Sequence, residues 1–280
     1  MAVNEKELQK ELAEDVYGAA GGKVVYLEGK TDVPILLGLL GAQGEQEVTG
    51  GVLYGGALIR GLRDRRGSGS TAVQQRIAFA QRHGIRGILG VLDGDGESLV
   101  SLASDFDPPH AGPQFRWKTY CIENLLVRAG WPGVWGPAPD WRAVMDSYAP
   151  YVAINRLELE LLVRLKRVGL GQYVRPGSTQ ASWTAAEVLQ RLRAVKHELM
   201  GLDVEDMFST ELAHFKAALA VSVDEAHALL NGKWLVDVFA AKHTRTTPEV
   251  CRVEWAQHLR EIGGDPEIKG WWRRVVAPRP

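Results

Sequence analysis

The sequence predicts an α/β domain with a largely parallel sheet flanked by helices, followed by a mainly helical C-terminal region. Between residues 23 and 130, short apolar runs alternate with amphipathic segments, and this β-α-β alternation is typical of parallel sheets. Beyond residue 131, the apolar residues recur with helical spacing instead. We therefore expect three parts: an N-terminal helical extension (1–22), an α/β domain (23–130) and a helical C-terminal domain (131–280).

The elements of the α/β part are predicted from their apolar runs and flanking residues. A buried strand is expected over Lys23–Leu27, and a helix follows it, with Thr31 or Asp32 as its cap and Pro34 in its first turn. The next helix begins at Ser70 or Thr71 and ends before Gly84. Three more strands are predicted at 52–54, 86–92 and 115–122, the first of them ending in Gly55-Gly56 at the ligand-binding edge of the sheet.

A connector rich in proline, glycine and tryptophan, WPGVWGPAPDW (131–141), separates the two parts. Its tryptophans, Trp131, Trp135 and Trp141, can either stack on nucleic-acid bases or, as connector aromatics more often do, pack the parts together. Beyond it, apolar spacing predicts helices at 156–170, 185–200, 210–221 and 249–262.

Composition excludes several classes of protein. The 280 residues can bury a proper core, and 45% hydrophobic with 24% charged residues is ordinary for a globular protein. A net charge of −1 argues against a generally basic nucleic-acid coat protein, although not against a local basic surface. Two cysteines are too few for a disulfide scaffold or a four-ligand zinc site, and Cys121 is expected to be a small buried side chain. With neither a secretory signal nor an apolar run of membrane-spanning length, we expect a cytoplasmic protein.

Acidic residues follow two of the predicted strands, where they have no packing role. Glu28 and Asp32 come after the first strand, and Asp93, Asp95 and Glu97 come after the strand that ends in GILGVL. Carboxylates are the ligands that Mg²⁺ prefers, so this pattern predicts a divalent-metal site, with Mg²⁺ or Mn²⁺ as the cofactor. The alternative is that these residues are caps and turns on an ordinary α/β sheet.

Basic residues gather beside this edge. The guanidinium group of arginine can bind two phosphate oxygens at once, so contact with nucleic acid is one interpretation of these basic residues. A solvated charged surface is the other. The candidate nucleic-acid ligands here are Lys30, Arg60, Arg63, Arg65 and Arg66.

The motifs together resemble the Toprim domain, which occurs in primases, topoisomerases, recombination mediators and OLD-family nucleases. The resemblance rests on a strand ending in Glu28-Gly29, a Gly-Gly turn, and a strand ending in Asp93-Gly94-Asp95. Asp32 lies four residues after Glu28, and this Glu-x-x-x-Asp arrangement is similar to that of the OLD-like nucleases. Two further stretches, YCIENLLV (120–127) and NGKWLVDVFA (231–240), resemble the Toprim effector subunits of the PARIS anti-phage systems.

The resemblance implies a function and a set of site residues. Glu28, Asp93 and Asp95 are expected to be catalytic, and the metal ligands would come from Glu28, Asp32, Asp93, Asp95, Glu97 and Glu123. Lys233 is added to the candidate nucleic-acid ligands, although the helical tail does not align residue by residue. The implied activity is a Mg²⁺-dependent endonuclease that acts as a toxic effector, cleaving tRNA or other nucleic acid once an ABC- or AAA-type ATPase partner of the same operon releases it. A homodimer is compatible with this type of effector.

Two other classes of function are compatible with the sequence. A non-catalytic Toprim protein could bind nucleic acid or a partner, as recombination mediators do, although a complete acidic set that does no chemistry would carry electrostatic strain. Strand passage or primer synthesis needs further modules, for which 280 residues leave little room.

Overall fold

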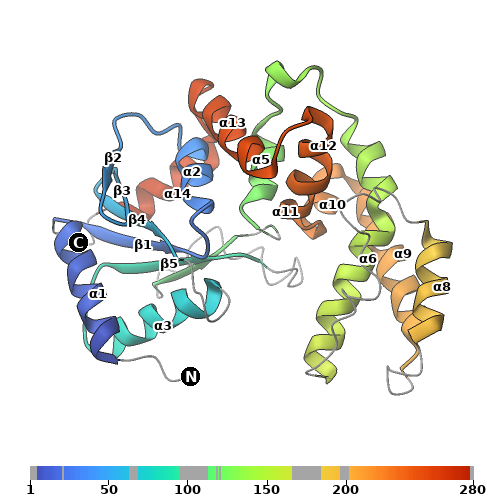
Figure 1. Ribbon diagram of the computed structural model, residues 1–280, viewed down its shortest axis with the longest axis horizontal. Helices are drawn as coiled ribbons and strands as arrows, with labels where there is room; N and C mark the ends of the chain where they lie inside the picture. The colour runs from blue at the N-terminus through green and yellow to red at the C-terminus, as the bar shows by residue number, and fades with distance from the viewer. Residues whose placement is uncertain are drawn as a thin grey trace.

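The computed structural model describes residues 5–20, 22–62, 69–94, 113–117, 119, 121–165, 184–195 and 202–277. In Figure 1 the sheet and its covering helices lie on one side, and the helices α6, α8 and α9 form a separate group on the other. None of the helices in these ranges is both long enough and apolar enough to cross a membrane.

The sheet is mostly parallel, which confirms the predicted α/β fold. The described strands form a six-stranded sheet in the order β2-β3-β4-β1-β5-β6. Strand β1 (Lys23–Leu27) lies in the centre and pairs in parallel with β4 (Ala57–Gly61) and β5 (Ile88–Leu92). Strand β6 (Gln114–Arg116) extends the parallel part beyond β5. The other edge is antiparallel and consists of β2 (Gln46–Val48) and β3 (Gly51–Tyr54).

The structure corrects the predicted position of Gly55-Gly56. These glycines have φ values of +57° and +82° and form the hairpin turn between β3 and β4. The Gly56 carbonyl accepts a hydrogen bond from the N–H of Lys23, the first residue of β1. The turn therefore lies at the opposite edge from Glu28. The prediction was wrong because the short strand β4 was missed, and it is β4 that returns the chain to the Glu28 edge.

One face of the sheet is covered by the N-terminal helices. Helix α1 (Glu5–Gly18) packs beside α3 (Gly69–Arg82), and their apolar residues join those of the sheet in one core that includes Leu12, Tyr26 and Val73. Ion pairs from Arg76 to Glu11 and from Arg82 to Glu5 tie the two helices together.

The opposite face is covered by helices from both ends of the chain. Helices α2 (Asp32–Leu39) and α5 (Glu123–Ala129) follow the strands directly, whereas α13 (Pro248–Glu261) and α14 (Pro266–Val276) come from the predicted C-terminal region. All contribute to one core with the sheet residues, and Trp271 of α14 packs against Phe115 and Trp117 with ring centroids 5.8 and 5.2 Å away. The last helices are thus part of the sheet's own packing.

The rest of the C-terminal region is helical, as predicted. Its described elements are the short η1 (Gly133–Trp135), α6 (Trp141–Leu165), α8 (Ala185–Val195), α9 (Val204–Val221), α10 (Val223–Leu229), α11 (Gly232–Trp234), the π-helical η3 (Leu235–Ala240) and α12 (Ala241–Thr244). Helix α6 begins well before the predicted start at residue 156, because its first turns pack on the shared core through residues such as Met145.

The connector tryptophans pack with one another. The ring of Trp131 meets those of Trp135, Trp141 and Trp255 edge to face, at centroid separations of 5.0, 5.6 and 5.4 Å. Edge-to-face geometry is favourable for aromatic pairs. These side chains therefore join the connector to α13, which agrees with the packing role.

Candidate functional site

Two acidic residues meet where adjacent parallel strands end. Glu28 follows β1 and Asp93 follows β5, and the register pairs Leu27 with Val91. A Glu28 carboxylate oxygen accepts a hydrogen bond from the Asp93 backbone N–H at 2.9 Å. The predicted neighbourhood of Glu28 and Asp93 is therefore present, at the carboxyl edge where open α/β sheets bind ligands.

Tight backbone contacts hold this edge together. A Cβ atom on Gly94 would lie 2.2 Å from the Thr119 carbonyl oxygen, and one on Gly69 would lie 2.2 Å from the Glu28 carbonyl oxygen. The Asp93-Gly94 turn is therefore packed so closely against the segment after β6 that only glycine can be accommodated at position 94. Strand β6 ends at Arg116, earlier than the predicted 122, and the chain then runs along the site to α5.

Asp32 is buried at the same edge rather than acting as a helix cap. Its side chain accepts a hydrogen bond from the Gly29 N–H at 2.7 Å, and the start of α2 has no side-chain capping bond from Thr31. Burial, and then the charges of Asp93 and Glu123, raise its pKa to about 7. Asp32 thus lies within the electrostatic reach of two other carboxylates, as expected of a cation-binding cluster.

Glu123 joins the site from the first turn of α5. The residue is 1% exposed, and one of its oxygens pairs with Arg252 Nε of α13 at 3.2 Å. Its other oxygen, Oε2, is buried and has no hydrogen-bond partner among the described residues. A buried carboxylate oxygen without a donor is costly, and a bound cation would offset that cost. Arg252 also binds Asp237 of η3 at 2.7 Å.

Asp93 itself is 3% exposed and is bound by two donors. The Ile122 N–H donates to its Oδ1 at 3.3 Å, and Lys233 Nζ of α11 lies 2.7 Å from its Oδ2. Burial lowers the pKa of Lys233, but the charges of Asp93 and Glu123 outweigh this and raise it overall, so the ammonium keeps its charge. Lys233 therefore lies inside the acidic site.

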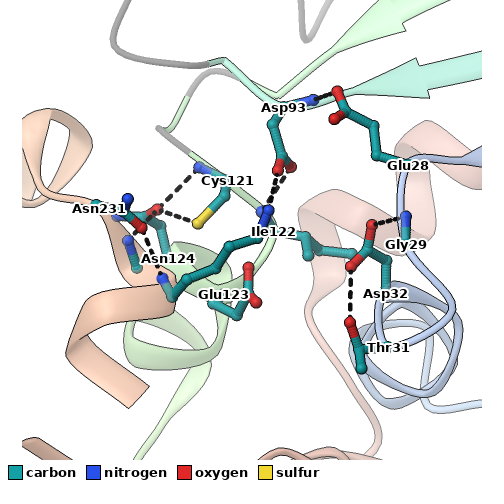
Figure 2. A network of polar contacts seen from close by, with 12 residues as sticks. Glu28, Gly29, Thr31, Asp32, Asp93, Cys121, Ile122, Glu123, Asn124 and Asn231 are labelled. Carbon is teal, nitrogen blue, oxygen red and sulfur yellow. Dashed lines mark hydrogen bonds and ion pairs between the residues drawn. The ribbon is translucent and has the colours of Figure 1, made fainter. Parts of the chain in front are cut away.

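Asn124 connects the two stretches that resembled the PARIS effectors (Figure 2). The residue is fully buried, and its Oδ1 accepts hydrogen bonds from the N–H groups of Cys121 at 3.0 Å and Gly232 at 3.2 Å. Its Nδ2 donates to the carbonyl oxygens of His227 and Leu230, both at 2.8 Å. Asn124 thus holds the turn before Lys233 against the loop before α5.

The structure does not bring every predicted residue into this acidic group. Asp95, Glu97, Arg63, Arg65 and Arg66 lie outside the described residues. Lys30 is exposed near the site, whereas Arg60 faces α1, where its guanidinium pairs with Asp15 and donates to the Gly50 carbonyl oxygen at 2.9 Å. Arg60 is therefore already engaged within the protein.

The cysteine near the site is a buried thiol. Burial, followed by the nearby charges of Glu123 and Asp93, raises the pKa of Cys121 well above its usual value. Because the thiolate is the reactive form, Cys121 is not an activated nucleophile. Its burial agrees with the small apolar role predicted for it.

The oxygen donors suit a divalent cation chemically, but their arrangement is incomplete. Figure 2 shows Glu28, Asp32, Asp93 and Glu123 facing a common region from separate segments of the chain. Within the described ranges, however, no three His, Cys, Asp or Glu side chains are grouped closely enough to hold a metal ion. The unpartnered Glu123 oxygen and the crowding around Asp32 fit a cation, and Lys233 provides positive charge at Asp93.

Two contributors to this site were missed by the sequence analysis. Asn124 stands directly after Glu123 in YCIENLLV, so the motif contained it, but nothing local indicated its partners. Arg252 reaches Glu123 from 129 residues along the chain, and its helix carries no motif that points to the site. The comparisons with known proteins do not add to this: no family model, no curated protein and no solved structure matches the chain.

Proposed function

We propose that this chain is a Mg²⁺-dependent endonuclease of the Toprim type, acting as the toxic effector of an anti-phage defence system. The observation that carries the proposal is the convergence of Glu28, Asp32, Asp93 and Glu123 at the carboxyl edge of the parallel strands. Buried like charges in such a group are costly without a cation, and phosphodiester cleavage is a reaction that uses one.

Each residue has a defined role in this proposal. Glu28, which accepts a hydrogen bond from the Asp93 N–H, would accept a proton from an attacking water. Asp32, Asp93 and Glu123 are the candidate oxygen ligands among the described residues, and they would hold the cation only after moving closer together. Asp95 and Glu97, which lie outside the described residues, are the other candidates. A bound divalent cation would supply the charge that stabilises the oxygens of the phosphate during cleavage.

The substrate and partner are proposed from the resemblance. We favour tRNA over DNA as the nucleic acid, and an ATPase of the same operon as the partner that keeps the effector inactive. Lys30 is exposed next to the acidic edge, which supports a phosphate contact there.

The test is inducible expression of the wild type and of Glu28→Gln without any partner. Glutamine can still accept the Asp93 N–H bond, so the variant removes the charge with little change in packing. RNA ends are sequenced and chromosomal DNA is examined on gels. We expect toxicity and new RNA ends at discrete tRNA positions in the wild type, and neither in Glu28→Gln.

A matched control is Asp146→Asn, which neutralises an exposed carboxylate on α6. It should remain as toxic as the wild type. Equal toxicity and equal cleavage in Glu28→Gln would overturn the proposal, and fragmented chromosomes in place of tRNA ends would change the substrate to DNA.

A second function is favoured by the ion pair between Lys233 and Asp93. A lysine that neutralises the site would suit a non-catalytic Toprim protein that binds nucleic acid or a partner. Purified protein with Mg²⁺ or Mn²⁺ separates the two functions. Salt-sensitive binding of RNA or DNA without any cleavage would support the adaptor role.

A further inference from the structure

Lys233 occupies the position at Asp93 where a cation is expected. Its Nζ lies 2.7 Å from Asp93 Oδ2, while the other oxygen, Oδ1, already accepts the Ile122 N–H. Its charge also lowers the pKa of Asp32, against the larger effects of burial and the carboxylates, so the ammonium acts on more than one member of the acidic group.

The position of Lys233 is determined by buried contacts. Asn124 binds the Gly232 N–H and the carbonyl oxygens of His227 and Leu230, and the Asn231 side chain accepts the Lys233 N–H at 3.1 Å. A Cβ atom on Gly232 would lie 2.5 Å from the Asn124 backbone nitrogen. This close fit places the start of α11 at the site edge.

The acidic group has room for further positive charge. The buried Oε2 of Glu123 has no partner among the described residues, and this residue is 1% exposed. The Lys233 side chain, in contrast, is 43% exposed, so part of it already contacts solvent. A divalent cation at Asp93 Oδ2 and the ammonium would repel each other at contact distance, and both need the same oxygen.

We propose that Lys233 is a built-in counter-ion that competes with the divalent cation for Asp93, so that metal loading requires its ammonium to leave the site. The inference rests on the proposed metal-dependent function. It makes the turn between α10 and α11 a determinant of metal affinity, because the Asn124 contacts keep the lysine in place. A partner that moves this turn would change metal loading without touching a metal ligand.

The test is direct titration of metal-free protein with Mn²⁺ by calorimetry, which needs no activity. Lys233→Met keeps the side-chain bulk and removes the charge, and we expect it to bind Mn²⁺ about tenfold more tightly or better, which corresponds to about 1.4 kcal/mol. Lys216→Met, which removes an exposed lysine of α9, should bind like the wild type. Asp93→Asn should lose binding.

Two outcomes separate this inference from the proposed function. If Mn²⁺ binds the wild type but binds Lys233→Met equally or more weakly, the competition is overturned and the metal site stands. If Mn²⁺ binds neither the wild type nor any variant, both the competition and the proposed metal-dependent function are overturned.

A second measurement uses the wild-type protein alone, in case Lys233→Met does not fold. Amine labelling read by mass spectrometry reports how accessible the ammonium is. We expect Mn²⁺ to increase labelling of Lys233 at least about threefold, since an amine that has left the buried Asp93 carboxylate is more accessible to the reagent. Lys216 labelling should not change. Unchanged or reduced labelling of Lys233 when Mn²⁺ is bound would overturn the competition.

Discussion

At the scale of single residues, Asp32 is a buried carboxylate under electrostatic strain. It is 4% exposed, and burial together with the charges of Asp93 and Glu123 raises its pKa to about 7 from the usual 3.8. Between pH 3.8 and about pH 7, the folded protein therefore keeps a proton on Asp32, whereas the unfolded chain has released it. The contribution of Asp32 to stability therefore falls as pH rises through this window.

We predict that Asp32→Asn stabilises the metal-free protein at pH 8. Asparagine can still accept the Gly29 N–H bond, and it removes a buried charge whose pKa shift corresponds to about 4 kcal/mol at most. Thermal unfolding at pH 8 and pH 4 measures the effect, with a gain expected at pH 8 and little at pH 4. A variant no more stable than the wild type at pH 8 would contradict the raised pKa.

His227 gives the opposite pH dependence. Burial, and then the charge of Arg128, lowers its pKa to about 4 from 6.5, and its Nε2 has no hydrogen-bond partner among the described residues. The unfolded chain binds a proton between these pH values and the folded protein does not. Its contribution to stability is therefore complete above pH 6.5 and is lost as pH falls towards 4.

We predict that His227→Gln flattens this part of the stability profile. In the wild type the histidine lowers the free energy of unfolding by about 3 kcal/mol between pH 6.5 and 4. Urea denaturation at several pH values measures this slope. His214→Gln, a change at an exposed histidine of α9, serves as the control and should keep the wild-type slope.

At the scale of elements, the turn between α10 and α11 is held against the loop before α5 by Asn124. The buried amide of this residue uses both its oxygen and its nitrogen, in bonds that span up to 108 residues of sequence. The π-helical η3 follows directly, and its Asp237 pairs with Arg252 of α13. Such π-helical turns are frequent at functional sites.

We predict that Gly232→Ala destabilises the protein by about 1–3 kcal/mol, the usual cost of overpacking. A Cβ atom here would approach the Asn124 nitrogen to 2.5 Å, so the turn would have to move and carry Lys233 away from Asp93. Chemical denaturation gives the free energy of unfolding. Gly133→Ala is the matched control, because a Cβ atom at Gly133 would meet nothing within 4 Å. Equal stability of the two variants would show that the turn is not tightly packed.

At the scale of the whole molecule, the sheet and the last two helices share a core. Trp255, Trp271 and Trp272 are each less than 5% exposed and belong to the same cluster as the apolar residues of β1 and β5. The Lys23 side chain also donates to the carbonyl oxygens of Val275 and Ala277, at 2.6 and 2.5 Å. The predicted boundary near residue 130 therefore does not divide the core.

We predict that Trp271→Ala lowers the free energy of unfolding by about 3–5 kcal/mol, the range for truncating a large buried aromatic residue. Because its ring lies against Phe115 and Trp117, far-UV circular dichroism and tryptophan fluorescence should show one coincident, shifted transition. Val221→Ala, at a 71% exposed position, should leave the midpoint unchanged. A helical transition that shifts while the sheet signal does not would contradict a shared core.

Local sequence patterns were sufficient for most of the sheet. Strand β1 has the predicted bounds, and α3 ends before Gly84, whose φ of +65° is one that glycine readily adopts. The short strands β2 and β4 were missed, because segments of three and five residues carry little periodic signal. Missing β4 also reversed the expected direction of the chain at Gly55-Gly56.

The sequence by itself determined that Glu28 and Asp93 lie together, because residues that follow parallel strands meet at one edge of the sheet. Only the tertiary structure decided that Lys233, Asn124 and Arg252 complete this edge. Their contacts join residues separated by 103 to 140 positions, and such pairings depend on how helices pack over the sheet rather than on any local pattern. The acidic residues are positioned by backbone direction, whereas the positive charge that balances them is positioned by the shared core.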